Sequence, residues 1–551
     1  MNIKEQYKHY LLIAFVGFLF FVPYLGHVHL FDWDEINFAE AAREMIATGD
    51  YSTVRINYQP FHEKPPLFIW MQVVSMKIFG INEFAARFPN AVIGIITLII
   101  IYSIGRKLYD YRFGILWVLS YLGSLLPHFY FRSGIIDPVF NLFIFLGIYY
   151  LHKQLSQYLT TKKNKYSLSF IAGVFVSFAV LTKGPVGYLL AALVFFTMMF
   201  LHRKEIKLSI NHFLMFSIVA FIPAIIWYLF ILPQSGANVL EEFVRYQIKL
   251  FSTEDAGHGG PFYFHFVVLL AGCFPASIIM LRAFRKNSED KPEQIQFRKW
   301  MITLLSVVLV IFSIVETKIV HYSSLAYFPI TFLSALAVHR LIYKNMEWKN
   351  STSWLIGIIG GILALLFICL PLVLMNIDLL LPRIKDVFTK EVLMANAGWY
   401  GFEYIPGILF LTGIIATLIL FKLRKYLTGF LTLFSATAFM IFIFLVAIAP
   451  RIEAYTQAAP IEFFTKLQDK NCYIHVLGYK SYAHYFYGKM RPSQTAQCKG
   501  MSSEDFENWL LKGEKDKPAF FVCKINNAKK YLLNPGMKYL YTKNGFVFMC
   551  R

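Results

Sequence analysis

Acidic and basic side chains gather in a few short segments of this sequence that could support acid–base or phosphate chemistry. Asp34 and Glu35 are adjacent, and the cluster His62-Glu63-Lys64-Pro65-Pro66 follows about thirty residues later. Asp137 lies in Gly134-Ile135-Ile136-Asp137-Pro138, and Lys183 lies in Leu181-Thr182-Lys183-Gly184-Pro185. A positioned carboxylate can accept or donate a proton, and lysine is an effective point charge for phosphate. These segments are therefore the candidates for a functional site.

Each candidate also has a simpler structural explanation. Apolar residues recur at helical spacing through 38–46 and predict a helix that ends near Gly49, so Asp34 and Glu35 fall in its first turn. Carboxylates in that position cap the helix and complement its dipole, which is worth about 1 kcal/mol. Lys64 and Lys183 lie near the ends of apolar runs and could simply reach the membrane interface. The residues alone leave both explanations open.

The elements that must position these residues are membrane spans. Of 551 residues, 57% are hydrophobic and only 16% are charged, and the mean hydropathy is +0.52. A soluble protein carries about a quarter charged residues, so the apolar excess must face lipid. Runs of about 17–25 apolar residues predict about thirteen spans, at 9–28, 89–105, 113–131, 135–152, 167–182, 185–201, 212–232, 262–281, 300–316, 321–339, 353–375, 403–421 and 427–449. The apolar run Pro65–Gly80 is too short to span and is expected at the interface or as a re-entrant segment.

Basic residues indicate the orientation of these spans. Dense clusters of lysine and arginine fall in alternate loops, within 106–112, 153–165, 203–207, 282–299, 340–349 and 422–425. Cytoplasmic loops carry such clusters, so the N-terminus is expected in the cytoplasm and, with an odd number of spans, the C-terminal hundred residues outside. Topology thus accounts for most of the net charge of +20, which leaves little reason to propose nucleic-acid binding. The first apolar run lacks a cleavage pattern and is expected to be an uncleaved span.

The predicted organisation is a membrane domain at 1–450 followed by an external α/β domain at 451–551. External loops at 29–88 and 233–261 belong to the membrane domain, and the first is long enough to suggest a function. In the tail, Cys472–Leu477, Ala519–Val522 and Phe546–Met549 resemble strands, and Ser502 or Ser503 resembles a helix start.

The tail holds four of the six cysteines, namely Cys472, Cys498, Cys523 and Cys550. An even number in an oxidising compartment suggests disulfides with three possible pairings, and free buried thiols are the alternative. Cys273 and Cys369 fall within spans and are expected to pack there.

An ordered set of motifs resembles the GT-C glycosyltransferases, and in particular the ArnT-like lipid A aminoarabinose transferases, with the protein O-mannosyltransferases as relatives. The set comprises the Asp34-Glu35 pair, the Glu63-Lys64-Pro65-Pro66 segment, Asn82-Glu83-Phe84-Ala85-Ala86-Arg87-Phe88-Pro89, Leu181-Thr182-Lys183-Gly184-Pro185, His258-Gly259-Gly260-Pro261-Phe262 and Lys318-Ile319-Val320-His321-Tyr322. The resemblance runs through the whole chain in order. It implies a polytopic α-helical membrane protein of the GT-C fold with about thirteen spans and an external α/β domain.

The resemblance implies an inverting transferase that moves a sugar from a polyprenyl (undecaprenyl) phosphate donor to an envelope acceptor. The expected acceptor is a lipid A or lipopolysaccharide glycolipid at the outer face of the bacterial inner membrane, and the runner-up is a protein acceptor. A flippase or transporter for lipid-linked sugars is the alternative from another class. Carboxylates clustered at the outer surface rather than within the spans weaken that alternative.

The resemblance also implies residue roles. Asp34 would be the catalytic carboxylate, and Asp137 and Glu35 would be further catalytic acidic groups. The donor phosphate or sugar would be bound by Lys64, Lys183, Lys318 and Tyr322. Fixed cations would stabilise the charge that develops on the departing phosphate. A carboxylate on the other side would accept the acceptor's proton or stabilise positive charge on the sugar.

A divalent metal, zinc by resemblance, would be bound by Glu63 and His258. Two protein ligands fall short of the three usual for catalytic zinc. The family's Asp-Glu-x-Arg-Tyr pattern is here Asp34-Glu35-Ile36-Asn37-Phe38. Loss of the arginine and of the tyrosine hydroxyl puts both aminoarabinose as the sugar and lipid A as the acceptor in question.

Overall fold

A computed structural model describes most of the chain. It covers residues 3–161, 166–201, 203, 210–235, 241–242, 245, 248–249, 253, 259–284, 290–344 and 346–551. Predictions that fall on other residues, including most of the loop 233–261, lie outside the described residues.

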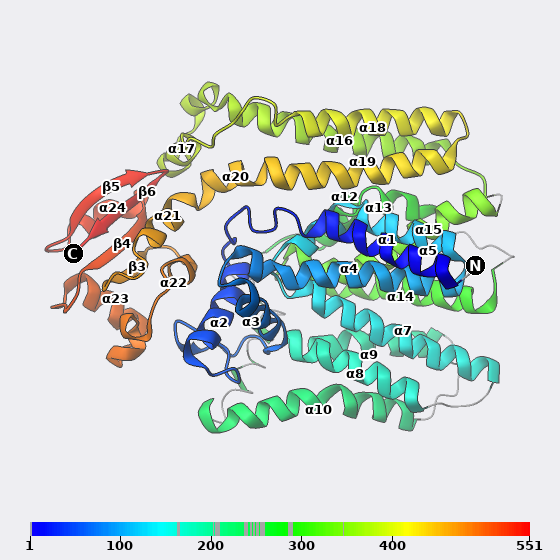
Figure 1. Cartoon of the computed structure of the whole chain (residues 1–551), viewed down its shortest axis with the longest axis horizontal. Coiled ribbons are helices and arrows are strands. Elements are labelled where there is room, and N and C mark those ends of the chain that lie inside the picture. Colours follow the sequence, from blue (N-terminus) through cyan, green and yellow to red (C-terminus); the bar gives the residue numbers. More distant parts are fainter. Residues whose placement is uncertain are drawn as a thin grey trace.

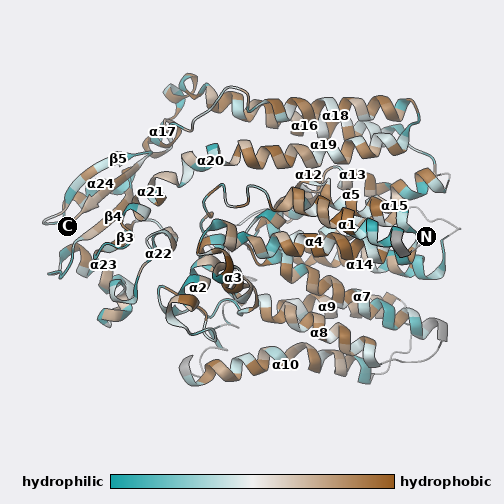
Figure 2. Ribbon diagram, viewed as in Figure 1, coloured by the Kyte–Doolittle hydropathy of each residue, from teal (hydrophilic) through white to brown (hydrophobic). Residues whose placement is uncertain are grey.

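The membrane part is a bundle of long apolar helices arranged side by side (Figure 1). Its elements are α1 (Ile3–Phe21), α4 (Glu83–Leu108), α5 (Tyr111–Leu122), α6 (Leu125–Phe129), η1 (Tyr130–Arg132), α7 (Asp137–Thr161), α8 (Tyr166–Lys183), α9 (Val186–Leu201), α10 (Ile210–Ser235), α12 (Phe264–Gly272), α13 (Ala276–Ile279), η2 (Met280–Phe284), α14 (Pro292–Ile314), η3 (Val320–Ala326), α15 (Tyr327–Tyr343), α16 (Asn350–Met375), α18 (Ile405–Lys422) and α19 (Tyr426–Ala447). Apolar residues dominate these helices along their length (Figure 2).

Every run predicted as a span contains helix in its described part, although the first helix ends at Phe21 rather than near residue 28, and the count of thirteen is not confirmed. Within the described ranges, eight helices are long and apolar enough to cross a membrane, or up to ten if two bent pairs each form one span. The bent pairs are α5 with α6 and η1, at 84°, and α12 with α13 and η2, at 107°. Among the others, α9 has only 16 residues and α1 begins with charged residues. The chain is therefore a multi-pass membrane protein whose helices differ in length more than the sequence suggested.

The first external loop folds into two helices and a small hairpin at the end of the bundle opposite the N-terminus (Figure 1). They are α2 (Asp34–Thr48), β1 (Arg55–Ile56), β2 (Gln59–Pro60) and α3 (Leu67–Phe79). Helix α2 ends as predicted, because Gly49 adopts a left-handed φ of 73° and donates its N–H to the Met45 carbonyl. Helix α3 has 13 residues, as expected of an apolar run too short to span.

The first external loop contacts the C-terminal region, since the Arg43 guanidinium of α2 and the Tyr58 hydroxyl of the hairpin both donate to the Met490 carbonyl, at 3.0 Å and 2.8 Å. Both regions lie at the same end of the bundle in Figure 1.

The C-terminal region contains a four-stranded sheet in the order β3-β4-β6-β5. Its strands are β3 (Tyr473–Leu477), β4 (Ala519–Lys524), β5 (Lys538–Lys543) and β6 (Phe546–Cys550), and its helices are α20 (Ala449–Thr456), α21 (Ala458–Lys466), α22 (Ala483–Tyr487), α23 (Ser503–Lys512) and α24 (Ile525–Leu532). Short helical turns η6 (Pro492–Gln494) and η7 (Ala496–Lys499) join α22 to α23, and η4 (Ile377–Leu379), η5 (Leu381–Arg383) and α17 (Val387–Leu393) lie between α16 and α18. Strands β3 and β4 are parallel, and β6 pairs antiparallel with β4 and β5.

Side chains alternate between the two faces of this sheet. Ile474 and Val476 pack with α21 and α22, whereas Tyr473 and Leu477 pack with α23 and α24. The three strands predicted from apolar runs and the helix start are confirmed, with Ser502 as the N-cap of α23, where its hydroxyl accepts from the Asp505 N–H. Strand β5 escaped prediction because it is a largely exposed edge strand without an apolar run.

All six cysteines are free thiols, so the predicted disulfides are absent and the alternative of free thiols holds. The sheet register explains this. Cys523 is paired with Leu477 at the far end of β3 from Cys472, and Cys550 is paired with Phe520. The strand geometry therefore keeps these side chains apart.

Candidate functional site

A cavity of about 750 Å³ lies where the external elements meet the ends of the bundle helices. Most of the residues predicted from sequence line it: Asp34, Glu35, Glu63, Lys64, Asp137, Lys183 and Tyr322. They come from α2, the loop before α3, α7, α8 and η3. The structure thus assembles in one place residues that lie almost 300 positions apart in the chain.

Two carboxylates face one histidine in this cavity. His321 Nε2 lies 3.5 Å from Asp34 Oδ2 and 3.6 Å from Asp137 Oδ2. The Asp34 side chain is 44% exposed, whereas that of Asp137 is only 3% exposed. Asp34 is therefore the carboxylate that a bound molecule can reach directly.

Helix capping does not account for Asp34. It is the first residue of α2, whose N-cap is Trp33, and that cap makes no side-chain hydrogen bond within the described part of the chain. Asp34 still complements the helix dipole, but its carboxylate is directed to the cavity and to His321.

The pairing of α7 with α8 brings Asp137 to Lys183. Asp137 is the first residue of α7 and Lys183 the last of α8, so each charge also complements the dipole of its own helix. Lys183 Nζ donates to Asp137 Oδ1 at 2.7 Å and lies 4.7 Å from the centre of the Tyr322 ring. Lys183 is thus held in a fixed position, with an aromatic surface beside it.

Lys64 interacts electrostatically with the charged residues of the same cavity. Burial lowers the pKa of Lys64, and the positive charge of Lys183 lowers it further. The carboxylates of Glu63, Asp34 and Asp137 oppose that effect. Two ammonium groups that repel each other at one end of a cavity form a suitable place for an anion.

Glu35 lines the cavity, yet its carboxylate is already occupied. Arg87 Nε and Nη2 donate to its two oxygens at 2.9 Å and 2.7 Å, and the Phe31 and Gly134 N–H groups donate as well. The Arg87 charge and these donors hold the pKa of Glu35 below its usual range against the effect of burial. A carboxylate so engaged positions the loop, and the direct catalytic role predicted for it has no support in this geometry.

One predicted residue that the structure describes is not brought into the cavity. Lys318 Nζ donates to the carbonyls of Phe312, Ser313 and Val315 and so caps the end of α14, which leaves no contact with the cavity. His258 lies outside the described residues.

The predicted metal therefore has one described ligand, Glu63. Within the described ranges, no three His, Cys, Asp or Glu side chains come close enough to hold a metal ion.

Five polar residues that line this cavity were not predicted as site residues: Asp32, Lys249, His321, Lys480 and Tyr482. His321 belongs to the motif Lys318-Ile319-Val320-His321-Tyr322, but no role was predicted for it. Lys480 and Tyr482 come from the C-terminal region, and the Tyr482 N–H donates to the Asp32 carboxylate at 3.1 Å. Only the fold could show that contact, because the two residues are 450 positions apart.

The two departures from the family pattern also lie here. Asn37 lines the cavity and is 7% exposed, and its Oδ1 accepts no hydrogen bond from the residues that the structure describes. Phe38 is buried against Phe68, with the ring centres 5.9 Å apart. Asn37 therefore has a buried acceptor without a described hydrogen bond beside the cavity, whereas Phe38 lines the cavity and packs against Phe68.

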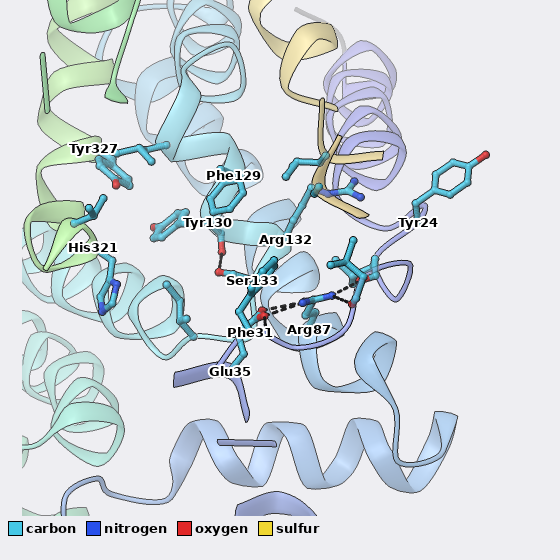
Figure 3. A pocket seen from close by; sticks show the side chains of 17 residues that line it. Tyr24, Phe31, Glu35, Arg87, Phe129, Tyr130, Arg132, Ser133, His321 and Tyr327 are labelled. Atoms are coloured by element: carbon cyan, nitrogen blue, oxygen red, sulfur yellow. Dashed lines mark hydrogen bonds and ion pairs between the residues drawn. The ribbon is translucent and has the colours of Figure 1, made fainter. Parts of the chain in front are cut away.

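A second, mainly apolar cavity of about 340 Å³ adjoins the first (Figure 3). Phe129, Tyr130 and Tyr327 contribute aromatic rings to it, and the Glu35–Arg87 pair lies at its edge. His321 and Phe31 line both cavities. A charged cavity thus adjoins an apolar one, an arrangement suited to an amphipathic molecule.

Comparison with known proteins gives consistent results. Residues 63–227 match the family described as dolichyl-phosphate-mannose-protein mannosyltransferase. The chain is 28% identical over 331 residues to an uncharacterized protein of Aquifex aeolicus, covering 60% of this chain and 63% of that protein. It is 25% identical over 362 residues to the undecaprenyl phosphate-alpha-4-amino-4-deoxy-L-arabinose arabinosyl transferase of Wigglesworthia glossinidia brevipalpis, covering 65% of this chain and 63% of that one.

Among solved structures, the chain is similar to ArnT from Cupriavidus metallidurans bound to undecaprenyl phosphate, with a TM-score of 0.74 at 16% identity. The match covers 100% of this chain and 98% of that one. The same protein in the apo state gives a TM-score of 0.76. The resemblance to ArnT-like GT-C proteins and the predicted fold class are therefore confirmed, whereas the aligned part spans just under two thirds of the sequence relatives above.

Proposed function

We propose that this ArnT-like membrane protein is an inverting glycosyltransferase that moves a sugar from a polyprenyl phosphate to an envelope glycolipid of the lipid A type. The observation that carries the proposal is the single cavity in which the Asp34 carboxylate shares space with Lys64 and Lys183. The relatives support the substrate class, since one is named for undecaprenyl phosphate-linked aminoarabinose transfer. Which sugar is moved, and onto which lipid, is part of the proposal.

The donor phosphate binds between Lys64 and Lys183. When the bond between the sugar and the phosphate breaks, negative charge grows on the departing phosphate oxygen. Ammonium groups already fixed beside that oxygen stabilise the transition state without reorganisation. The Asp137 carboxylate, 2.7 Å from Lys183 Nζ, holds that lysine in place.

Asp34 acts on the other side of the sugar. The acceptor oxygen attacks the anomeric carbon as the bond to phosphate breaks, so the configuration at that carbon inverts. Asp34 accepts the proton of an acceptor hydroxyl, or stabilises positive charge on the sugar if the acceptor is itself a phosphate. His321, between Asp34 and Asp137, holds the two carboxylates at a fixed separation.

The apolar cavity holds a hydrocarbon segment of one of the lipid substrates. Its lining is largely aromatic and aliphatic, and it opens beside the catalytic cavity through the shared residues Phe31 and His321. A polyprenyl or acyl chain bound there would place its polar headgroup among the charged residues.

The proposed location is the bacterial inner membrane, with the N-terminus in the cytoplasm and the catalytic cavity and residues 451–551 in the periplasm. The placement of the N-terminus and the C-terminal sheet at opposite ends of the bundle supports this orientation (Figure 1). Cysteine-accessibility labelling tests it: residues 451–551 should react with an impermeant reagent from outside, and 290–299 only after permeabilisation. Labelling of both segments from one side would contradict the orientation.

Zinc bound by Glu63 and His258 remains a proposal that comes from the resemblance. It would add positive charge near the donor phosphate, beside Lys64. Metal analysis of purified protein and of Glu63→Gln decides it, because a specific site would lose its metal in the variant.

Mass spectrometry of envelope lipids from cells with and without the gene tests the function. We expect one glycolipid to lose the mass of a single sugar when the gene is removed and to regain it on complementation. Loss of sugar from a protein instead would favour a protein acceptor. Unchanged lipids and proteins, with lipid-linked sugar accumulating, would favour a flippase and contradict the proposal.

A further inference from the structure

A polar cavity of about 440 Å³ lies within the C-terminal region and shares Lys480 with the site described above. It is bordered by β3, α22 and the first turns of α23, which lie near one another in Figure 1. Its volume falls in the range of roughly 300–1,000 Å³ usual for small-molecule sites. The proposed reaction uses none of its side chains.

His484 is the feature that points to a ligand. Its side chain lines this cavity and is only 3% exposed, and neither ring nitrogen has a hydrogen-bond partner among the described residues. Burial and the neighbouring His475 hold the pKa of His484 well below its usual value, so the ring is neutral. A neutral imidazole has one donor and one acceptor. Buried polar groups are normally paired, so a molecule that both donates and accepts would complete this site.

The surrounding groups narrow the chemistry of that molecule. Glu507 Oε2 lies 3.1 Å from His475 Nε2, and Glu504, Asn508 and Ser503 line the same space. Carboxylate oxygens accept hydrogen bonds from hydroxyl or amino groups and repel phosphate, while the asparagine amide both donates and accepts. Such a set suits a ring that carries several hydroxyl groups.

Aromatic rings complete the arrangement. Tyr479 and Tyr485 line the cavity, and the centre of the Tyr485 ring lies 3.8 Å from that of His484. The flat faces of such rings pack against the C–H groups of a sugar. Polar groups at the edges of the cavity can then bind the hydroxyls.

One segment of chain separates this cavity from the catalytic one. Lys480 lines both cavities, and its Nζ lies 4.4 Å from the centre of the Trp33 ring at the catalytic cavity. The next residues are held to the first external loop by the hydrogen bond between the Tyr482 N–H and Asp32. A molecule with more than one sugar could therefore occupy both cavities at once.

We propose that this polar cavity of the C-terminal region binds a sugar ring of the acceptor headgroup. That ring would lie next to the part of the acceptor that receives the transferred sugar. The inference rests on the proposed function for the identity of the molecule as the acceptor. The site would then select acceptors by their saccharide headgroup, while the catalytic cavity determines where transfer occurs.

Direct binding tests the site without any catalysis. Saturation-transfer NMR on the full-length protein in nanodiscs would use D-glucosamine, D-glucose and, as an anion control, inorganic phosphate observed through its phosphorus signal. We compare the double variant Ser503→Ala/Asn508→Ala, whose positions are exposed, with Ser493→Ala, an exposed position of the same region outside the cavity. We expect sugar signals in the wild type and the control and their loss in the double variant. Equal sugar signals in all three proteins, or binding of phosphate alone, would overturn the inference.

A transfer assay then links the site to the acceptor. Loss of two hydrogen bonds should raise KM for a glycolipid with several sugars by about tenfold, with kcat and the KM for donor unchanged. An acceptor with a single-sugar headgroup should show no change. A wild type that transfers no sugar to any acceptor would refute the proposed function and leave the binding result intact. Normal transfer with equal KM values in wild type and double variant would refute this inference alone.

Discussion

Two buried acid–base pairs border the same cavity, and they differ in what is left unsatisfied. Glu35 and Arg87 form a closed set in which both carboxylate oxygens accept from Arg87 and the guanidinium also donates to the carbonyls of residues 25, 28 and 29. Asp137 accepts from Lys183 through Oδ1 only, and its Oδ2 has no hydrogen bond from the described residues. In the first pair both carboxylate oxygens are hydrogen-bonded, and the pair holds the loop in place. In the second pair one carboxylate oxygen has no hydrogen bond from the described residues beside the cavity.

This difference distinguishes structural charges from functional ones more reliably than burial does. Both pairs are buried, and both join residues distant in sequence. In the second pair, Asp137 also lies 3.6 Å from His321, which in turn lies 3.5 Å from the partly exposed Asp34. Substitutions in the first pair should therefore affect folding, and substitutions around the second should affect sugar transfer.

The largest effect is expected from Asp34→Asn. Asparagine preserves the size and most hydrogen bonds of the side chain and removes its charge. If Asp34 is the catalytic carboxylate, the transfer rate should fall roughly 10²–10⁴-fold, with an unchanged melting temperature. The measurement is single-turnover transfer by purified protein. Near-normal transfer would remove Asp34 from the mechanism and leave Asp137 as the next candidate.

A smaller effect, on stability rather than rate, is expected from Glu35→Gln. The change leaves the Arg87 charge buried without its partner, and breaking a buried ion pair costs roughly 3–5 kcal/mol. Thermal unfolding in detergent should show a clearly lowered melting temperature, and the protein that remains folded should retain its kcat. Glu83→Gln, an exchange in the first turn of α4 outside this pair, is the control. A fully stable Glu35→Gln protein with no transfer activity would instead show that Glu35 acts directly in catalysis.

Lys64→Ala should weaken the use of donor more than folding. The change removes a charge-assisted contact to phosphate, worth roughly 1.5–3 kcal/mol, or about 10- to 150-fold in kcat/KM for donor. The exposed Lys77 of α3 provides the matched control Lys77→Ala. Equal kcat/KM values for donor in both variants would show that Lys64 only reaches the membrane interface.

The sequence predicted the elements well because each has a local signal. Apolar runs located the helices and three of the four strands of the C-terminal sheet, and Gly49 marked the end of α2. The bends after α5 and α12 were not predicted, because an apolar run has the same composition whether the helix is straight or broken.

The sequence motifs identified most of the residues that line the cavity. The residues that contact them could not be identified, because they lie far away in the sequence. Arg87 lies 52 residues from Glu35, and Lys480 enters the cavity from the C-terminal region. Such contacts depend on how distant elements pack, which no local pattern records.

A third group of charges, formed by Glu40, Arg43 and Glu44, lies within α2 itself. Arg43 donates to both oxygens of Glu40 at 2.6 Å, which leaves Glu44 without a cation of its own. Burial, together with the Glu40 charge, raises the pKa of Glu44 to about 9. At neutral pH one proton on Glu44 therefore neutralises the charge that lacks a cation. In the group around Asp137, a bound ligand would take that part.

The smallest predicted effect follows from that proton and appears as a dependence of stability on pH. The pKa of Glu44 is higher in the folded protein than its ordinary value of 4.5, so the folded state binds the proton more tightly than the unfolded state. Its contribution is complete below that ordinary value and declines as pH rises toward about 9. Between pH 7 and pH 8 the free energy of unfolding should fall by at most about 1.4 kcal/mol. Glu44→Gln fixes the neutral form, retains the acceptor for the Tyr58 N–H, and should flatten the melting temperature between pH 6 and pH 9. An equally steep decline in the variant would assign the pH dependence to other groups and show that Glu44 is ionised in the folded protein.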